Sequence, residues 1–71
     1  MNRRIEYLLA SNLEYDEINF EVWVDGELFV EVVDGVPLTV RVYPRSDGEA
    51  WVMSVGELEV ALSRARTRLQ T

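Results

Sequence analysis

Three Asp-Gly pairs, Asp25-Gly26, Asp34-Gly35 and Asp47-Gly48, constrain the fold of this chain more than any other feature of the sequence. Each pair lies between apolar runs. Asp-Gly in that setting is the strongest short-range signal for a β-hairpin, because glycine accepts a positive φ without steric cost. Three such turns predict four strands in an antiparallel meander.

Every second residue is apolar in the first three predicted strands, which span about residues 17–24, 28–33 and 37–43. Alternation with period two is typical of a half-buried strand. The fourth strand, about residues 49–53, allows two orientations. Either Trp51 and Met53 or Ala50 and Val52 face the core, and the first pair fills a small core better.

The register of the strands follows from parity, since a slip of one residue turns each apolar set towards solvent. Three-residue loops at 25–27 and 34–36 keep the apolar residues on one face. They pair Val24 with Leu28, Val22 with Val30, Phe20 with Val32, Val32 with Leu38, and Val30 with Val40. The opposite face then receives Trp23 opposite Phe29, Phe29 opposite Arg41, Glu21 opposite Glu31, and Glu27 opposite Tyr43.

We expect a helix after the strands, because Ser54-Val55-Gly56-Glu57 has the pattern of a capping box at a helix N-terminus. The apolar stripe of this helix consists of Val55, Leu58, Leu62, Ala65 and Leu69. A short N-terminal helix is also predicted, with Ile5, Leu8 and Leu9 on one side and Ser11-Asn12 at its end. Two helices on one face of a four-stranded antiparallel sheet give an α+β fold, and we expect residues 1–71 to form a single domain.

The chain has no cysteine and no histidine, which excludes disulfides, a thiolate nucleophile and the usual zinc ligands. We therefore predict that it is not an enzyme and has neither a cofactor nor a metal site. Asp25-Gly26-Glu27 and Asp47-Gly48-Glu49 lack the repeated spacing of a calcium loop and are better explained as turns. No apolar run reaches the length of a membrane span, so we expect a cytoplasmic protein.

The net charge of −6 is unevenly distributed. Between Ile5 and Val40 there is no basic residue, whereas the acids are Glu6, Glu14, Asp16, Glu17, Glu21, Asp25, Glu27, Glu31 and Asp34. Such a field opposes contact with nucleic acid and steers a basic protein partner towards the chain. The C-terminal arginines, Arg64, Arg66 and Arg68, lie where a helix dipole favours cations, so direct nucleic-acid binding is the weaker interpretation.

The face of the sheet turned away from the helices is the predicted binding surface, because nothing is expected to cover it. Aromatic residues and arginine dominate binding hot spots. The partner-binding residues predicted from the register are Trp23, Phe29, Arg41, Glu21, Glu27, Glu31 and Tyr43. Two other interpretations stay open: the aromatic pairs only stiffen a small sheet, or this face closes a homodimer with a structural role.

Several segments together resemble a group of small acidic bacterial proteins. They are Asn12, Tyr15-Asp16-Glu17, Glu21-Val22-Trp23-Val24-Asp25-Gly26, Val42-Tyr43-Pro44, Trp51 and the helix with Ala61, Ala65 and Leu69. The group comprises immunity proteins of interbacterial toxin systems and phage-encoded inhibitors of host defence. The resemblance implies an antitoxin-like or anti-CRISPR-like inhibitor that blocks a basic partner, such as a nuclease toxin or a defence nuclease complex. It assigns no individual binding residue.

Overall fold

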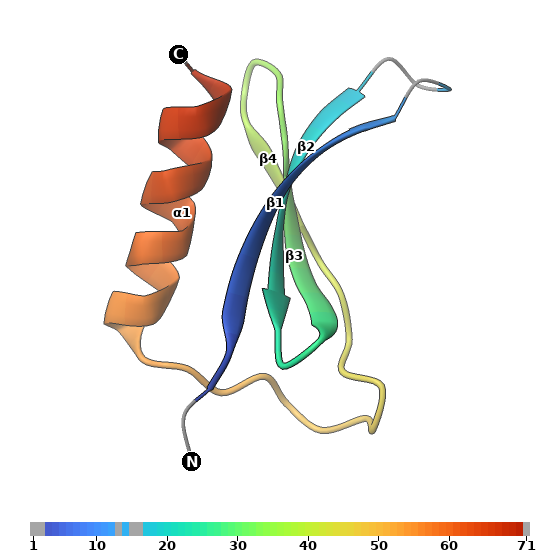
Figure 1. Ribbon diagram of the computed structural model, residues 1–71, viewed down its shortest axis with the longest axis vertical. Coiled ribbons are helices and arrows are strands. Elements are labelled where there is room, and N and C mark those ends of the chain that lie inside the picture. Colours follow the sequence, from blue (N-terminus) through green and yellow to red (C-terminus); the bar gives the residue numbers. More distant parts are fainter. Residues whose placement is uncertain (1–2, 13, 15–16, 71) are drawn as a thin grey trace.

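Four strands and one helix make up the computed structural model, which describes residues 3–12, 14 and 17–70 (Figure 1). The elements are β1 (Ile5–Asn12), β2 (Glu17–Val24), β3 (Glu27–Val33), β4 (Thr39–Val42) and α1 (Val55–Leu69). The strands pair antiparallel in the order β1-β2-β3-β4, and α1 packs on one face of the sheet. The predicted α+β meander with a C-terminal helix is therefore confirmed, although its four strands are not the four that were predicted.

The predicted N-terminal helix is wrong, because residues 5–12 form β1. The segment also has a period of two, with Ile5, Tyr7 and Leu9 opposite Val24, Val22 and Phe20 of β2. Eight residue pairs join β1 to β2, and the ring of Tyr7 stacks on that of Phe20 with centroids 5.7 Å apart. These tertiary contacts outweigh a local pattern that fits both periods, since the adjacent Leu8 and Leu9 suit a helix equally well.

The β2–β3 hairpin turns through two residues, not the predicted three. Asp25 and Gly26 both have positive φ, at 51° and 83°, as a tight hairpin turn requires. Val24 pairs with Glu27, and a bulge between Val22 and Trp23 then shifts the register. Beyond it, Val22 pairs with Val30, Phe20 with Val32, and Glu21 with Glu31, as predicted. The extra residue at the bulge thus keeps the apolar residues of β2 and β3 on the same face, which a two-residue turn alone would not have done.

The β3–β4 connection is longer than predicted and covers residues 34–38. Val30 pairs with Val42 and Val32 with Val40, a shift of two residues from the predicted register. A shift of two keeps every side chain on its predicted face but changes its neighbour across the strands. Arg41 consequently lies opposite Glu31 and not opposite Phe29.

The predicted fourth strand at 49–53 is also wrong, since these residues lie in a connection between β4 and α1 that does not pair with the sheet. Asp47-Gly48 does form a turn, in which the amide of Gly48 donates to the carbonyl of Arg45 at 3.1 Å. The favoured orientation is nevertheless correct: Trp51 and Met53 pack against the core and Val52 is exposed. The Trp51 indole fixes this segment by donating to the carbonyl of Tyr43 at 2.7 Å.

The predicted capping box of α1 is confirmed. The Glu57 amide donates to Ser54 Oγ at 3.0 Å, and the Ser54 amide donates to Glu57 Oε1 at 2.9 Å. The helix contacts the sheet through Ala61 and Ala65, both buried, and its most extensive contact is with β2. Small side chains let the helix lie close to the valines and phenylalanines of the core, which are Phe20, Val22, Val24, Phe29, Val30 and Val32.

Candidate protein-binding face

The outer face is the face of the sheet opposite α1. Because side chains alternate along a strand, it carries the residues that alternate with the inward-facing positions of the four strands. Its charged residues are Glu6, Glu17, Glu21, Glu31 and Arg41. Arg4, directly before β1, pairs with Glu6 at 3.2 Å. With Arg4 included, four glutamates and two arginines give this face a charge of −2.

Glu31 is the centre of a hydrogen-bonded network on the outer face, and it is only 7% exposed. Its carboxylate accepts from Asn19 Nδ2 at 3.3 Å, from Arg41 at 3.4 Å and from the hydroxyl of Tyr43. Arg41 also donates to Glu17 at 2.8 Å. A buried carboxylate is tolerated when donors compensate its lost hydration, so this network explains why Glu31 can lie opposite another glutamate.

The network also raises the pKa values of two of its members, Tyr43 and Arg41. The hydrogen bond from the Tyr43 hydroxyl to Glu31, with desolvation adding to it, raises the pKa of Tyr43 above its ordinary value of 10.0. Hydrogen bonding to Tyr43 and Glu17 raises the pKa of Arg41. Arg41 therefore remains a cation, and Tyr43 a neutral hydroxyl donor, throughout the physiological pH range.

Trp23 lies beside this network, on the outer face and away from the helix. It is half-buried, and its indole donates to Glu21 Oε1 at 3.0 Å. On β1, Glu6 pairs with Trp23, and Leu8, which is 53% exposed, pairs with Glu21. We call Glu6, Leu8, Glu21 and Trp23 the Trp23 patch. A hollow of about 260 Å³ beside it is lined by Glu6, Leu8 and Trp23 together with Tyr7.

Phe29 is not on the outer face, so its prediction as a partner-binding residue is wrong. It is buried in the core, and its ring lies 5.1 Å from that of Trp51, centroid to centroid. The bulge on β3 is the cause, since it leaves Phe29 outside the pairing between Leu28 and Val30. Trp23 consequently pairs with Leu28 and has no aromatic neighbour across the strands.

Glu27 is likewise not opposite Tyr43. It pairs with Val24 at the hairpin turn, and its carboxylate accepts from the amide of Ser46 at 2.9 Å. The amide of Tyr43 instead donates to the carbonyl of Phe29 at 2.9 Å. Glu27 thus joins the β2–β3 turn to the segment that follows β4.

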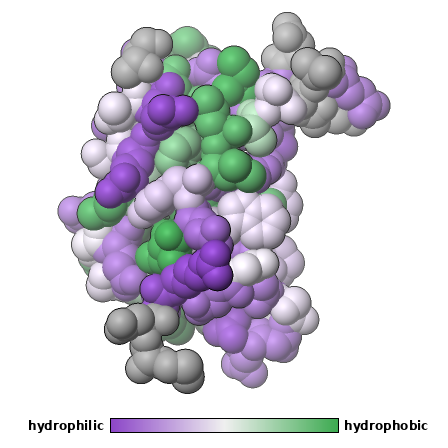
Figure 2. Space-filling view, in the orientation of Figure 1, coloured by the Kyte–Doolittle hydropathy of each residue, from purple (hydrophilic) through white to green (hydrophobic). Residues whose placement is uncertain are grey.

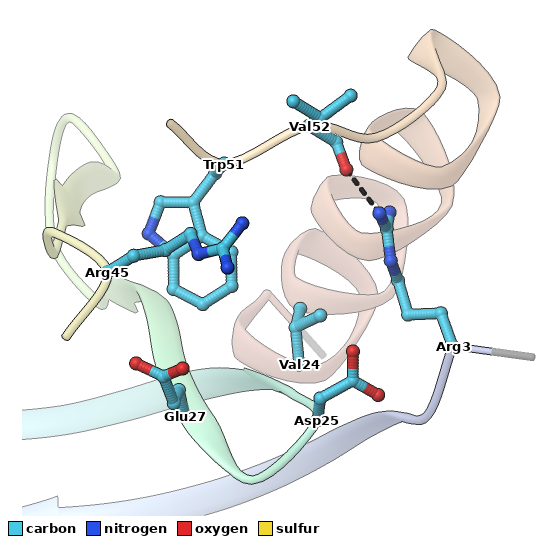
Figure 3. A pocket seen from close by; sticks show the side chains of 7 residues that line it. All are labelled: Arg3, Val24, Asp25, Glu27, Arg45, Trp51 and Val52. Carbon is cyan, nitrogen blue, oxygen red and sulfur yellow. Dashed lines mark hydrogen bonds between the residues drawn. The ribbon is translucent and has the colours of Figure 1, made fainter. Parts of the chain in front are cut away.

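A second pocket, of about 150 Å³, lies between that turn and the segment before α1 (Figure 3). Its charged side chains already have partners within the chain. Arg3 donates to the carbonyl of Val52, and Asp25 accepts from the amide of Arg4 at 2.9 Å. Arg45 lies over the ring of Trp51 and pairs with Asp47 at 2.6 Å. These contacts hold the segment before α1 in place, so we assign the residues around this pocket a structural role.

Sequence reasoning missed Glu17 and Asn19 as members of the Glu31 network. Both precede Glu21 at steps of two along β2, so their face was predictable. The partner of Glu17 was not, because it is Arg41 on β4, whose register differs by two residues from the prediction. Of the predicted residues, the structure gathers Glu21, Trp23, Glu31, Arg41 and Tyr43 on the outer face and places Phe29 and Glu27 elsewhere.

The remaining candidate features have structural explanations. The guanidinium of Arg64 lies 5.0 Å from the ring centroid of Tyr7 and thereby holds the helix against β1. Within residues 3–12, 14 and 17–70, no three acidic side chains are grouped so that they could hold a metal ion. In the same ranges, no helix combines the length and apolarity needed to cross a membrane.

Comparisons with known proteins found no match among family models, curated proteins or solved structures. The resemblance to immunity-type and phage-encoded inhibitors therefore stays a prediction.

Proposed function

We propose that this chain is a small non-catalytic domain that inhibits a basic protein by covering part of its surface with the outer face. The Trp23 patch carries the proposal. It combines a half-buried indole with an exposed leucine on a face that no helix covers. Tryptophan within a polar rim is typical of binding hot spots. A nuclease toxin or a nucleic-acid-handling defence complex has the basic surface that such a face would fit.

Charge favours a basic partner over a second copy at this face. The outer face has a charge of −2, so two copies would repel each other across it. Glu21 supports the same conclusion, because its described contacts include the Trp23 indole but no arginine. A cation supplied by the partner would pair with Glu21 while the partner's apolar atoms cover Leu8 and Trp23.

The residues of the outer face have different roles in this proposal. Trp23 and Leu8 anchor the partner through buried apolar area. Glu21 steers its approach, whereas Glu6 is already paired with Arg4 at 3.2 Å. Glu31, Arg41 and Tyr43 hold β3 and β4 together beside the patch and do not touch the partner. Trp23→Ala should therefore weaken binding by about 30-fold or more, the effect expected for a hot-spot residue.

The test is a pull-down from cells of the native host with the tagged protein, followed by titration of the recovered partner's activity. Trp23→Ala is compared with Val60→Ala, which removes an exposed apolar side chain from the helix instead. The proposal requires a basic protein that wild type and Val60→Ala capture, that Trp23→Ala loses, and whose activity falls to zero at one equivalent. Circular dichroism confirms that both variants are folded.

Two results would contradict the proposal. Equal capture by wild type and Trp23→Ala would exclude the Trp23 patch as the contact. A partner that stays fully active when saturated would show binding without inhibition.

A further inference from the structure

One helix leaves part of the inner face of the sheet, the face on which α1 lies, uncovered. A helix is about 10 Å wide and strands lie about 4.8 Å apart, so α1 covers about two of the four strands. Val40 and Val42 of β4 point to the inner face, since they pair with the buried Val32 and Val30. They are nevertheless 44% and 67% exposed.

One flank of α1 faces β1, and the other faces β4. The β1 flank is identified by Arg64, which lies over Tyr7, and by Val60, which lines a hollow with Ile5 and Tyr7. Leu62 is two residues from both Val60 and Arg64, so it projects from the opposite flank. It is 36% exposed and lies on the side of the uncovered valines. Figure 2 shows hydrophobic side chains gathered between the helix and the crossing strands.

A stripe beside this flank is complementary to itself. Glu59, Leu62, Ser63 and Arg66 line a shallow hollow of about 220 Å³. They are spaced at steps of three, one and three, so they form one helical face. The stripe has a carboxylate at one end, a guanidinium at the other, and its midpoint between Leu62 and Ser63. When a second stripe is rotated by 180° about this midpoint and laid on the first, the guanidinium of each stripe lies opposite the carboxylate of the other.

We propose that a second copy of this chain docks here, with the two α1 helices antiparallel about a two-fold axis between Leu62 and Ser63. Glu59 of each copy then meets Arg66 of the other, so two ion pairs form. The small Ser63 leaves room for Leu62 of the second copy. The same approach brings the second copy over Val40 and Val42, which α1 leaves exposed.

Charge favours a second copy as the occupant of this face. Helix α1 is nearly balanced, with Glu57 and Glu59 against Arg64, Arg66 and Arg68. The excess acid of the chain lies in residues 5–40, on the hairpins and the outer face. Within the described ranges, neither Glu59 nor Arg66 forms an ion pair in its own chain. Both charges are therefore available to another molecule.

The test is sedimentation equilibrium over a range of concentrations, with charge-swap variants. Wild type should dimerise, and Glu59→Arg and Arg66→Glu should each weaken the dimer by about tenfold or more, because each places like charges opposite one another. An equimolar mixture of the two variants should dimerise again, since unlike charges then meet. The double variant Glu59→Arg/Arg66→Glu should also dimerise.

Glu49→Arg is the matched control, because it makes the same charge change at an exposed position outside the helix and should leave the dimer intact. Trp23→Ala should leave it intact as well, which separates this proposal from the one for the outer face. A monomeric wild type, single variants that dimerise like wild type, or a mixture that stays monomeric would each overturn the proposal.

Discussion

Glu31 illustrates how one residue can define a region of this protein. A carboxylate that is 7% exposed and lies opposite Glu21 would destabilise the sheet if it had no partner. Asn19, Arg41 and Tyr43 supply three donors to it. The network ties β2, β3 and the end of β4 together by side chains as well as by the backbone.

Tyr43 should report on this network through its titration. Because hydrogen bonding to Glu31 raises its pKa in the folded state, its contribution to stability is fully present below the ordinary value of 10.0. That contribution is lost as the pH rises through the raised pKa. We expect Glu31→Gln to return the Tyr43 pKa towards its ordinary value, as followed by the ultraviolet absorbance of tyrosinate.

The control for this titration is Tyr43→Phe, whose curve is subtracted to remove the other tyrosines. If the tyrosinate curves of wild type and Glu31→Gln coincide after subtraction, the hydroxyl does not donate to Glu31 in solution.

Phe29 marks the limit of prediction at the residue scale. Alternation alone places Phe29 beside Glu31 on the outer face, because both have odd numbers. A bulge changes this parity at one position, and nothing in the composition of β3 indicates where it occurs. Trp23 and Glu21 lie on β2, which keeps its regular alternation because the extra residue of the bulge is on β3, so their face was predicted correctly.

At the scale of elements, the capping box of α1 is the most predictable feature, since it depends on residues only three positions apart. Ser54→Ala should cost about 1 kcal/mol in the free energy of unfolding, because it leaves a first-turn amide without its acceptor. Urea denaturation measures this loss. Ser63→Ala, at an exposed position within the helix, should change stability little or raise it slightly.

An equal loss in the two serine variants would mean that the cap at Ser54 contributes nothing specific.

The other elements show why sequence predicts some segments and not others. Strands β2 and β3 were predicted because every second residue of each is apolar and an Asp-Gly turn joins them. Residues 5–12 were not, because Leu8 and Leu9 fit both periods and only pairing with β2 decides between them. The segment 49–53 has strand-forming residues, but Trp51 packs on Phe29 and bonds to Tyr43, and this holds it outside the sheet.

At the scale of the whole molecule, two alanines set the distance between the helix and the sheet. Ala65 has no exposed surface and Ala61 almost none. Ala65→Leu should push α1 away from β2 and cost roughly 1–3 kcal/mol in the free energy of unfolding, as over-packing of a core does. Denaturation followed by the fluorescence of the tryptophans measures this cost.

Ala50→Leu adds the same side chain at an exposed position and should be nearly neutral. Unchanged stability in Ala65→Leu would mean that the helix does not lie as close to the sheet as its buried alanines indicate.

Each strand after β1 pairs with the strand before it in the chain, and α1 comes after all four. During synthesis, each hairpin can close as soon as its second strand has left the ribosome. The inner face stays uncovered until residues 43–69 follow, which takes roughly 1–5 s at ~5–20 residues per second. Throughout that interval Val22 and Val30, the most deeply buried large side chains of the finished protein, face solvent on a nascent sheet. They are the residues that a ribosome-associated chaperone would meet.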